Sequence, residues 1–117
     1  MRIAMIGTGY VGLVSGVCFS DFGHDVVCVD KIAAKVDTLL AGGVPIYEPG
    51  LEDMLRRNVA AGRLGFTTDL TEAVKGAQAV FIAVGTPTRR GDGHADLTYV
   101  SAAAKELADV IETGTVV

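Results

Sequence analysis

Three glycines near the start of the sequence, Gly7, Gly9 and Gly12, form a G-x-G-x-x-G pattern. A short apolar run precedes them and residues with helix-compatible spacing follow, which is the context in which this pattern binds the diphosphate of a dinucleotide. Gly7 would allow the tight turn, Gly9 would let the diphosphate approach the backbone, and Gly12 would let the helix pack close to the strand. The backbone N–H groups of Tyr10 and Val11 would then face the diphosphate from the positive end of the helix.

An acidic residue, Asp30, stands at the end of the next apolar, β-branched run. A carboxylate there can accept hydrogen bonds from an adenosine ribose and would repel a 2′-phosphate, so the sequence predicts NAD as the cofactor and not NADP. Lys31 weakens this prediction slightly, since a nearby basic residue can accept such a phosphate. The alternative is a glycine-rich packing turn without a ligand, because the glycine pattern alone is weak evidence in a sequence with 15 glycines.

The elements that would position these residues alternate between strand and helix. We expect strands at residues 2–6, 25–29, 66–68 and 78–84, the start of a fifth at 115–117, and helices at 10–22, 32–40, 51–61, after Asp69, and at 97–111. This order predicts an α/β fold, a Rossmann-type doubly wound parallel sheet, in a single domain covering residues 1–117. The sequence stops inside an expected strand, so we also expect a truncated piece of a larger protein.

In such a sheet, ligands bind beyond the carboxyl ends of the strands, where the strand order reverses. The glycine turn, Asp30 and a loop opening at Gly85 should therefore meet. Helix starts are expected at Asp69, which has Glu72 three residues on in the form of a capping box, and at Asp96 as an N-cap. Pro49 would fall in the first turn of the helix over residues 51–61, with Glu48 at its start.

Composition excludes several other functions. The net charge is −4, and no stretch gathers lysines and arginines, so we expect no nucleic-acid binding. No apolar run is long enough to span a membrane and no signal peptide is recognisable, which predicts a cytoplasmic protein. Cys18 and Cys28 lack metal-ligand spacing and are interpreted as reduced, buried hydrophobic residues. His24 and His94 lack the partners expected of a catalytic base, and with no metal-ligand spacing in the sequence we expect no metal site in this chain.

Four further motifs, in order along the chain, make the sequence resemble the nucleotide-sugar dehydrogenases of the UDP-glucose/GDP-mannose dehydrogenase family. They are the Gly-Tyr-Val-Gly-Leu-Val-Ser-Gly string at 9–16, Glu-Pro-Gly-Leu at 48–51, Val-Gly-Thr-Pro at 84–87, and Ala-Asp-Leu at 95–97 with Tyr-Val at 99–100. Details at 22–24, 66–69 and 90–94 are most similar to the members that oxidise UDP-glucose to UDP-glucuronate. Relatives that act on GDP-mannose or UDP-N-acetylmannosamine share the broader pattern and remain alternatives, as does a regulatory NAD-binding module without enzymatic activity.

The resemblance also implies roles for individual residues. Members of this family transfer two hydrides to two NAD molecules and pass through a thioester on a cysteine that lies in a later domain. By matched position, Gly9 and Val11 would present backbone to the diphosphate, Asp30 and Lys35 would address the ribose, and Thr86 would lie toward the nicotinamide. Lys35 could instead be a solvated helix lysine, and Thr86 a turn residue. The chain alone is expected to bind NAD weakly and to be inactive on UDP-glucose, and the full-length protein is expected to form a homodimer or a higher homo-oligomer.

Overall fold

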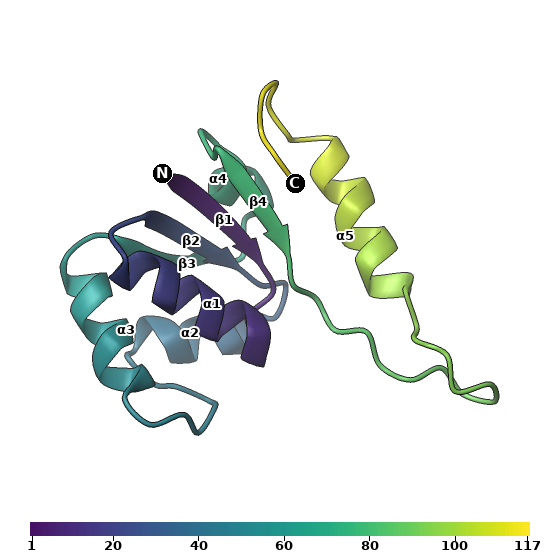
Figure 1. Cartoon of the computed structure of the whole chain (residues 1–117), viewed down its shortest axis with the longest axis horizontal. Helices are drawn as coiled ribbons and strands as arrows, with labels where there is room; N and C mark the ends of the chain where they lie inside the picture. Colours follow the sequence, from purple (N-terminus) through teal and green to yellow (C-terminus); the bar gives the residue numbers. More distant parts are fainter.

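The computed structural model describes all residues, 1–117, as a parallel four-stranded sheet with helices on both faces (Figure 1). The strands are β1 (Arg2–Ile6), β2 (Asp25–Val29), β3 (Leu64–Thr67) and β4 (Ala79–Ile82). The helices are α1 (Tyr10–Asp21), α2 (Ala33–Leu40), α3 (Leu51–Ala60), α4 (Leu70–Val74) and α5 (Thr98–Ala108). No helix has both the length and the apolar character needed to cross a membrane.

The order of strands in the sheet is β3-β2-β1-β4, with every pair parallel. The chain thus steps outward from β1 through β2 to β3, then crosses back to place β4 on the other side of β1. The backbone of Val116 pairs with Ala79 on the free side of β4, so one residue of the expected fifth strand is in place. This arrangement confirms the Rossmann-type α/β prediction.

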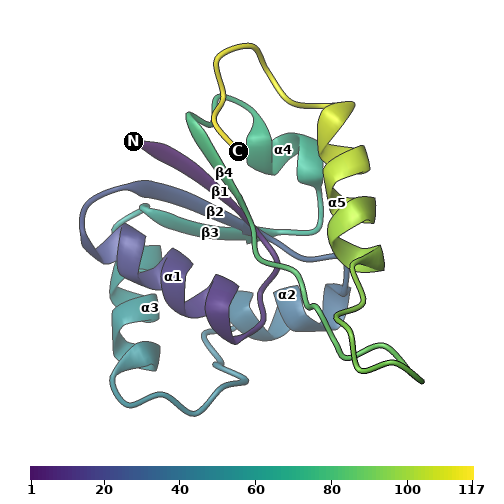
Figure 2. The same ribbon diagram turned by 45° about the vertical axis from the view of Figure 1, so that its right-hand side comes forward.

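Alternate residues of β1 supply two hydrophobic cores, one on each face of the sheet. Ile3 and Met5 join the core under α1, α2 and α3, whereas Ala4 and Ile6 join the core under α4 and α5. Figure 2 shows the two layers of helices on opposite sides of the sheet. Burial on both faces explains why the strands read as nearly continuous apolar runs.

Element boundaries agree closely at the start of the chain and less well after it. The strands at 2–6 and 25–29 are confirmed, and Gly23, with a φ of +105°, follows the first helix as expected. The strand expected at 66–68 begins earlier, at Leu64, and the one expected at 78–84 is shorter. The last helix ends at Ala108, three residues before its expected end.

The predicted helix starts are correct only in part. Asp69 caps α4 by accepting from the N–H groups of Thr71 and Glu72, but the Glu72 carboxylate accepts from the Thr67 hydroxyl and does not close a capping box. Leu97, not Asp96, is the N-cap of α5. The Asp96 carboxylate still accepts from the N–H of Thr98, at 2.9 Å. It therefore satisfies an N–H group at the start of α5 from the residue before the N-cap.

Helix α3 begins after Pro49, because Gly50 is its N-cap with a φ of +82°. This left-handed conformation turns the chain into the helix and favours glycine. The prediction that Pro49 lies inside the first turn is therefore wrong. Glu48 contributes to the helix start only through its backbone carbonyl, which accepts from the N–H of Leu51.

A buried asparagine, Asn58, ties α3 to the end of α1. Its side-chain NH₂ donates to Asp21 and to the carbonyl of Met54, and its side-chain oxygen accepts two hydrogen bonds from Arg63. Asn58 is fully inaccessible to solvent, and every polar atom of its side chain has a partner. A satisfied buried group of this kind specifies one packing arrangement.

We expect Asn58→Ala to lower the free energy of unfolding by about 2 to 3 kcal/mol, since it removes a buried side chain and leaves its partly buried partners Asp21, Met54 and Arg63 without these hydrogen bonds. Arg57→Ala is the control, because Arg57 contacts the same Asp21 carboxylate from the surface, where an ion pair contributes little to stability. Urea denaturation of both variants measures the difference. Equal decreases in the free energy of unfolding would show that the hydrogen bonds of Asn58 stabilise the fold no more than the exposed ion pair does.

Candidate functional site

The carboxyl ends of three strands converge at the point where the strand order reverses. The N–H of Gly7, just beyond β1, donates to the carbonyl of Val29 at the end of β2, at 2.8 Å. The N–H of Ala83, just beyond β4, donates to the carbonyl of Ile6, also at 2.8 Å. The glycine turn thus lies between the ends of β2 and β4, as expected for a ligand crevice.

The three glycines of the turn have different surroundings. Gly7 has a φ of +108°, and a Cβ there would lie 2.5 Å from the carbonyl oxygen of Ala83. A Cβ at Gly12 would overlap the carbonyl oxygen of Gly7, whereas a Cβ at Gly9 would meet no atom within 4 Å. Gly7 and Gly12 are therefore required by the fold, and Gly9 leaves the backbone open to solvent.

The close contact between α1 and the strands is made by a residue that the sequence interpretation had not singled out. A Cβ at Gly16 would lie 2.7 Å from the Sγ of Cys28 on β2, while Gly12 packs on the turn itself. Cys28 is fully buried, and this burial raises the pKa of its thiol to about 12. The Cys28 thiol is thus a neutral packing group, as its sequence context suggested.

The first turn of α1 has four backbone N–H groups without a partner in the chain. They belong to residues 9–12, and the bonding of the helix begins with the N–H of Leu13, which donates to the carbonyl of Gly9. No side chain caps this end of the helix, and no acidic residue lies in its first turn. Unpaired N–H groups and the positive end of the helix dipole together favour a bound anion.

Asp30 lies at the mouth of the same turn and already accepts three hydrogen bonds. Its Oδ2 accepts from the N–H of Thr8 at 3.1 Å and from the Thr8 hydroxyl at 2.7 Å. Its Oδ1 accepts from the N–H of Ile32 at 3.0 Å. The carboxylate therefore joins the glycine turn to the N-cap of α2.

The electrostatic surroundings keep Asp30 ionised. Partial burial opposes the charged form, but the hydrogen bonds from Ile32 and Thr8, together with the nearby positive charge of Lys35, outweigh it and lower the pKa of Asp30. Lys35 itself is exposed in the first turn of α2, and its side chain forms no ion pair within the chain. The structure thus brings Lys35 within electrostatic reach of Asp30, where a ligand could use both.

The neighbouring lysine, Lys31, is engaged elsewhere. Its Nζ lies 2.5 Å from the Oε1 of Glu106 on α5, and both side chains are substantially exposed. This ion pair links the turn after β2 to the helix on the other face of the sheet. The positive charge that could favour a 2′-phosphate is therefore partly neutralised by Glu106.

The sequence predicted a role only for the backbone N–H of Tyr10, but its side chain also makes a contact at the start of α1. Its hydroxyl donates to the Oε2 of Glu48 at 2.6 Å. The Glu48 carboxylate, as hydrogen-bond acceptor and as a neighbouring negative charge, raises the pKa of Tyr10. The loop before α3 is thereby fastened to the first residue of α1.

Thr86 lies in the loop after β4, which extends away from the sheet before it returns to α5 (Figure 1). Ala83 and Val84, at the start of this loop, lie against Gly7. Thr86 is exposed, and its hydroxyl makes no hydrogen bond in the chain. Further out, Thr88 pairs with Ala95 across a turn that contains an ion pair between Arg89 and Asp92.

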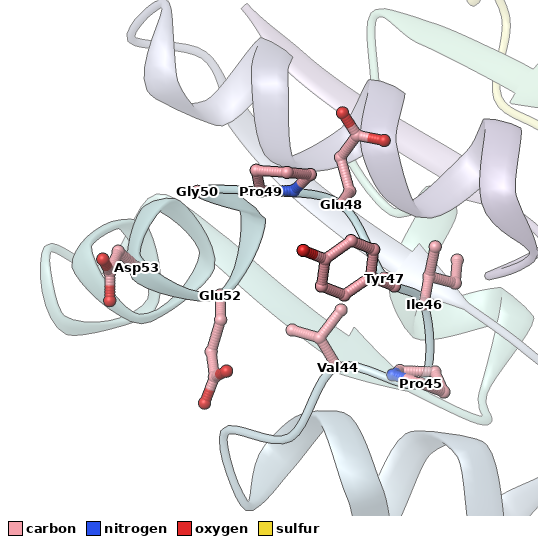
Figure 3. Close-up of a pocket in the computed structure, with 9 residues that line it drawn as sticks. All are labelled: Val44, Pro45, Ile46, Tyr47, Glu48, Pro49, Gly50, Glu52 and Asp53. Carbon is pink, nitrogen blue, oxygen red and sulfur yellow. The ribbon is translucent and has the colours of Figure 1, made fainter.

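Two of the hollows in the surface lie at the loop before α3 and beside α5, and neither is centred on the glycine turn. One, of about 420 Å³, is formed by the loop before α3 and contains three carboxylates, those of Glu48, Glu52 and Asp53, but no lysine or arginine. Figure 3 shows that the Glu48 carboxylate points to a different side from the other two, in agreement with its bond to Tyr10. The acidic lining of this first hollow is unsuited to phosphate groups. The other, of about 540 Å³, lies between α5 and the loop before it.

Thr8 is the polar site residue that the sequence interpretation missed. It occupies the variable position between the first two glycines, so the glycine pattern carries no information about its role. Its near-complete burial, 2% exposed, and its two bonds to a carboxylate 22 residues away appear only in the folded chain. Glu106 was missed for the same reason, since its partner Lys31 is 75 residues away.

Comparison with protein families gives a match over the whole chain. Residues 1–117 match the NAD-binding domain of the UDP-glucose/GDP-mannose dehydrogenase family. The chain is 64% identical, over all 117 of its residues, to the UDP-glucose 6-dehydrogenase of Rhizobium meliloti strain 1021. It covers 27% of that relative, so it spans about a quarter of the length of the curated proteins that it matches.

Solved structures of related enzymes contain the same fold. A ternary complex of GDP-mannose dehydrogenase from Pseudomonas aeruginosa superimposes with a TM-score of 0.87 at 43% identity, over 92% of this chain and 24% of that one. The UDP-D-ManNAc dehydrogenase of Pyrococcus horikoshii gives a TM-score of 0.90 at 35% identity, over 98% and 27% of the respective chains. The similarity therefore extends across enzymes that are named for different sugar nucleotides.

Proposed function

Because the chain belongs to the UDP-glucose/GDP-mannose dehydrogenase family as its NAD-binding domain, we propose that it serves an enzyme that oxidises UDP-glucose to UDP-glucuronate. The observation that carries the choice of sugar is the 64% identity to a UDP-glucose 6-dehydrogenase, against 43% and 35% for the structures named for GDP-mannose and UDP-D-ManNAc. NAD supplies the hydride acceptor for such an oxidation. The relatives named above are dehydrogenases and not regulatory modules.

In this proposal the glycine turn holds the diphosphate of NAD. The unpaired N–H groups of Gly9, Tyr10, Val11 and Gly12 donate to its oxygens, and the open backbone at Gly9 lets it come close. Gly7 and Gly12 keep the turn in shape. The Tyr10 hydroxyl, bound to Glu48, holds the adjacent loop beside the first turn of the helix without contacting the diphosphate.

The adenosine ribose would lie at Asp30. The carboxylate is ionised and has Lys35 nearby, so a ribose hydroxyl finds both an acceptor and a positive charge there. Thr86, whose hydroxyl is free, is assigned to the nicotinamide side of the crevice, beyond the start of the loop that contacts Gly7. The chain's own residues thus bind and orient the cofactor, and the bond-making residues belong to other parts of the enzyme.

The ion pair between Lys31 and Glu106 supports the choice of NAD over NADP. We expect Glu106→Gln to release Lys31 and to raise NADP affinity about two- to fivefold at low ionic strength, in line with the small energies of exposed ion pairs. Asp109→Asn, which removes a charge from the end of the same helix, is the control. Calorimetric titration at low and high salt measures the effect, which should vanish in a Glu106→Gln, Lys31→Gln double variant. A gain that persisted there would remove Lys31 from the explanation.

The sugar assignment is tested with a protein that contains this chain together with the remainder found in its relatives. We expect NADH formation with UDP-glucose at a ratio of two per UDP-glucuronate, and much slower reaction with GDP-mannose and UDP-N-acetylmannosamine. Preference for either of the latter would overturn the assignment but leave the NAD-binding role intact. The chain of residues 1–117 alone is expected to bind NAD without oxidising any of the three.

A further inference from the structure

Thr8 makes the most enclosed polar contact at the mouth of the glycine turn. Its hydroxyl and its backbone N–H both donate to the Oδ2 of Asp30, at 2.7 and 3.1 Å. The side chain is almost completely buried, so water does not compete for this hydroxyl. Asp30, by contrast, is only partly buried and faces the region that the ribose is proposed to occupy.

The hydrogen bonds to Asp30 limit what its carboxylate can offer a ligand. An ionised carboxylate has about four acceptor positions, two on each oxygen. Thr8 fills both positions on Oδ2, and the N–H of Ile32 fills one on Oδ1. One position, on Oδ1, remains for a ribose hydroxyl.

We propose that Thr8 is a positioning residue, which locks the Asp30 carboxylate in one orientation and thereby helps the domain to discriminate NAD from NADP. The proposal rests on the NAD-binding role proposed for Asp30. A locked carboxylate keeps its negative charge fixed beside the ribose 2′ position, where it accepts from a hydroxyl and repels a phosphate. Without the Thr8 hydroxyl, the carboxylate could rotate away and both effects would weaken.

Thr8→Val tests the proposal, because it replaces the hydroxyl with a methyl group of similar size. We expect NAD affinity to fall about fivefold, as for the loss of one hydrogen bond, while NADP affinity changes by less than about twofold. Thr8→Ser, which keeps the hydroxyl, should restore the original ratio of the two affinities. Calorimetry with NAD and NADP on the chain of residues 1–117 measures both, and circular dichroism verifies folding. Thr8→Ala provides the same comparison if the valine variant does not fold.

A second measurement separates positioning from a general effect on the turn. The pKa of Asp30, followed by carboxyl NMR, should rise in Thr8→Val and stay low in Thr8→Ser, because the hydroxyl stabilises the ionised form. Equal losses for NAD and NADP with an unchanged Asp30 pKa would overturn the proposal, since the diphosphate contacts are common to both cofactors. Failure of the unmodified chain to bind either nucleotide would instead overturn the proposed role of the site.

Discussion

Replacing Gly12 with alanine is expected to lower the free energy of unfolding by about 3 kcal/mol and to abolish measurable NAD binding. A Cβ at this position would overlap the backbone carbonyl oxygen of Gly7, and a backbone atom cannot move aside as the end of a flexible side chain can. The start of α1 must therefore shift away from the turn. The four unpaired N–H groups would move with it, so stability and binding fall together.

Gly9→Ala is the matched variant, because it adds the same methyl group three residues earlier. Its φ of −71° and ψ of −169° suit any residue, and the added Cβ meets nothing within 4 Å. We expect the free energy of unfolding to fall by about 1 kcal/mol, since alanine is a poorer N-cap than glycine. NAD affinity should fall about tenfold or more, because the methyl group occupies the space where the diphosphate approaches.

Urea denaturation and NAD titration of both variants separate the two roles. A Gly12→Ala variant with the stability of the unmodified chain would show that α1 can shift without cost. A Gly9→Ala variant with unchanged NAD affinity would place the diphosphate elsewhere.

Asp30→Ala is expected to weaken NAD binding about tenfold or more, in keeping with the loss of a hydrogen bond to a charged group. NADP affinity should stay the same or rise, because the charge that repels a 2′-phosphate is gone. The preference for NAD therefore shrinks more than in any Thr8 variant. Asp37→Ala, which removes an exposed carboxylate from α2, controls for the change in net charge.

The pH dependence of binding gives an independent measurement of the same carboxylate. The pKa of Asp30 is lowered in the folded chain, so the ionised form dominates at all pH values above the usual range of an aspartate. NAD affinity should be constant from pH 8 to about 5 and should fall only in more acidic solution. An affinity that already declined between pH 8 and 6 would assign the ribose contact to a different group.

Local sequence patterns predicted the first quarter of the fold well. The segment from Arg2 to Val29 contains two buried strands and a helix that ends before Gly23, and each boundary is marked by a change in residue type within a few positions. The first and last residues of β3 and β4 depend less on the local sequence, because a strand extends only as far as a neighbouring strand pairs with it. Leu64 joins β3 since it pairs with Val26, which no pattern around residue 64 indicates.

The candidate site was predictable to the same extent. The glycine turn and Asp30 follow from spacing, and the sheet places them together as expected. The partners that refine the site are distant in sequence: Thr8 on Asp30, Glu48 on Tyr10 and Glu106 on Lys31. Such contacts depend on the packing of whole elements, and a single sequence carries no periodic signal for them.

The position of β1 at the centre of the sheet affects how the chain can fold during synthesis. β1 leaves the ribosome before the other strands, but its partner β4 and the α5 residues that cover Ala4 and Ile6, among them Ala103 and Leu107, emerge much later. Until then α4 alone covers this apolar face of the nascent sheet, and the part that α5 will cover is open to aggregation. When translation is arrested before residue 103, the nascent chain should therefore bind chaperones. When it is arrested well after residue 108, the nascent chain should resist protease.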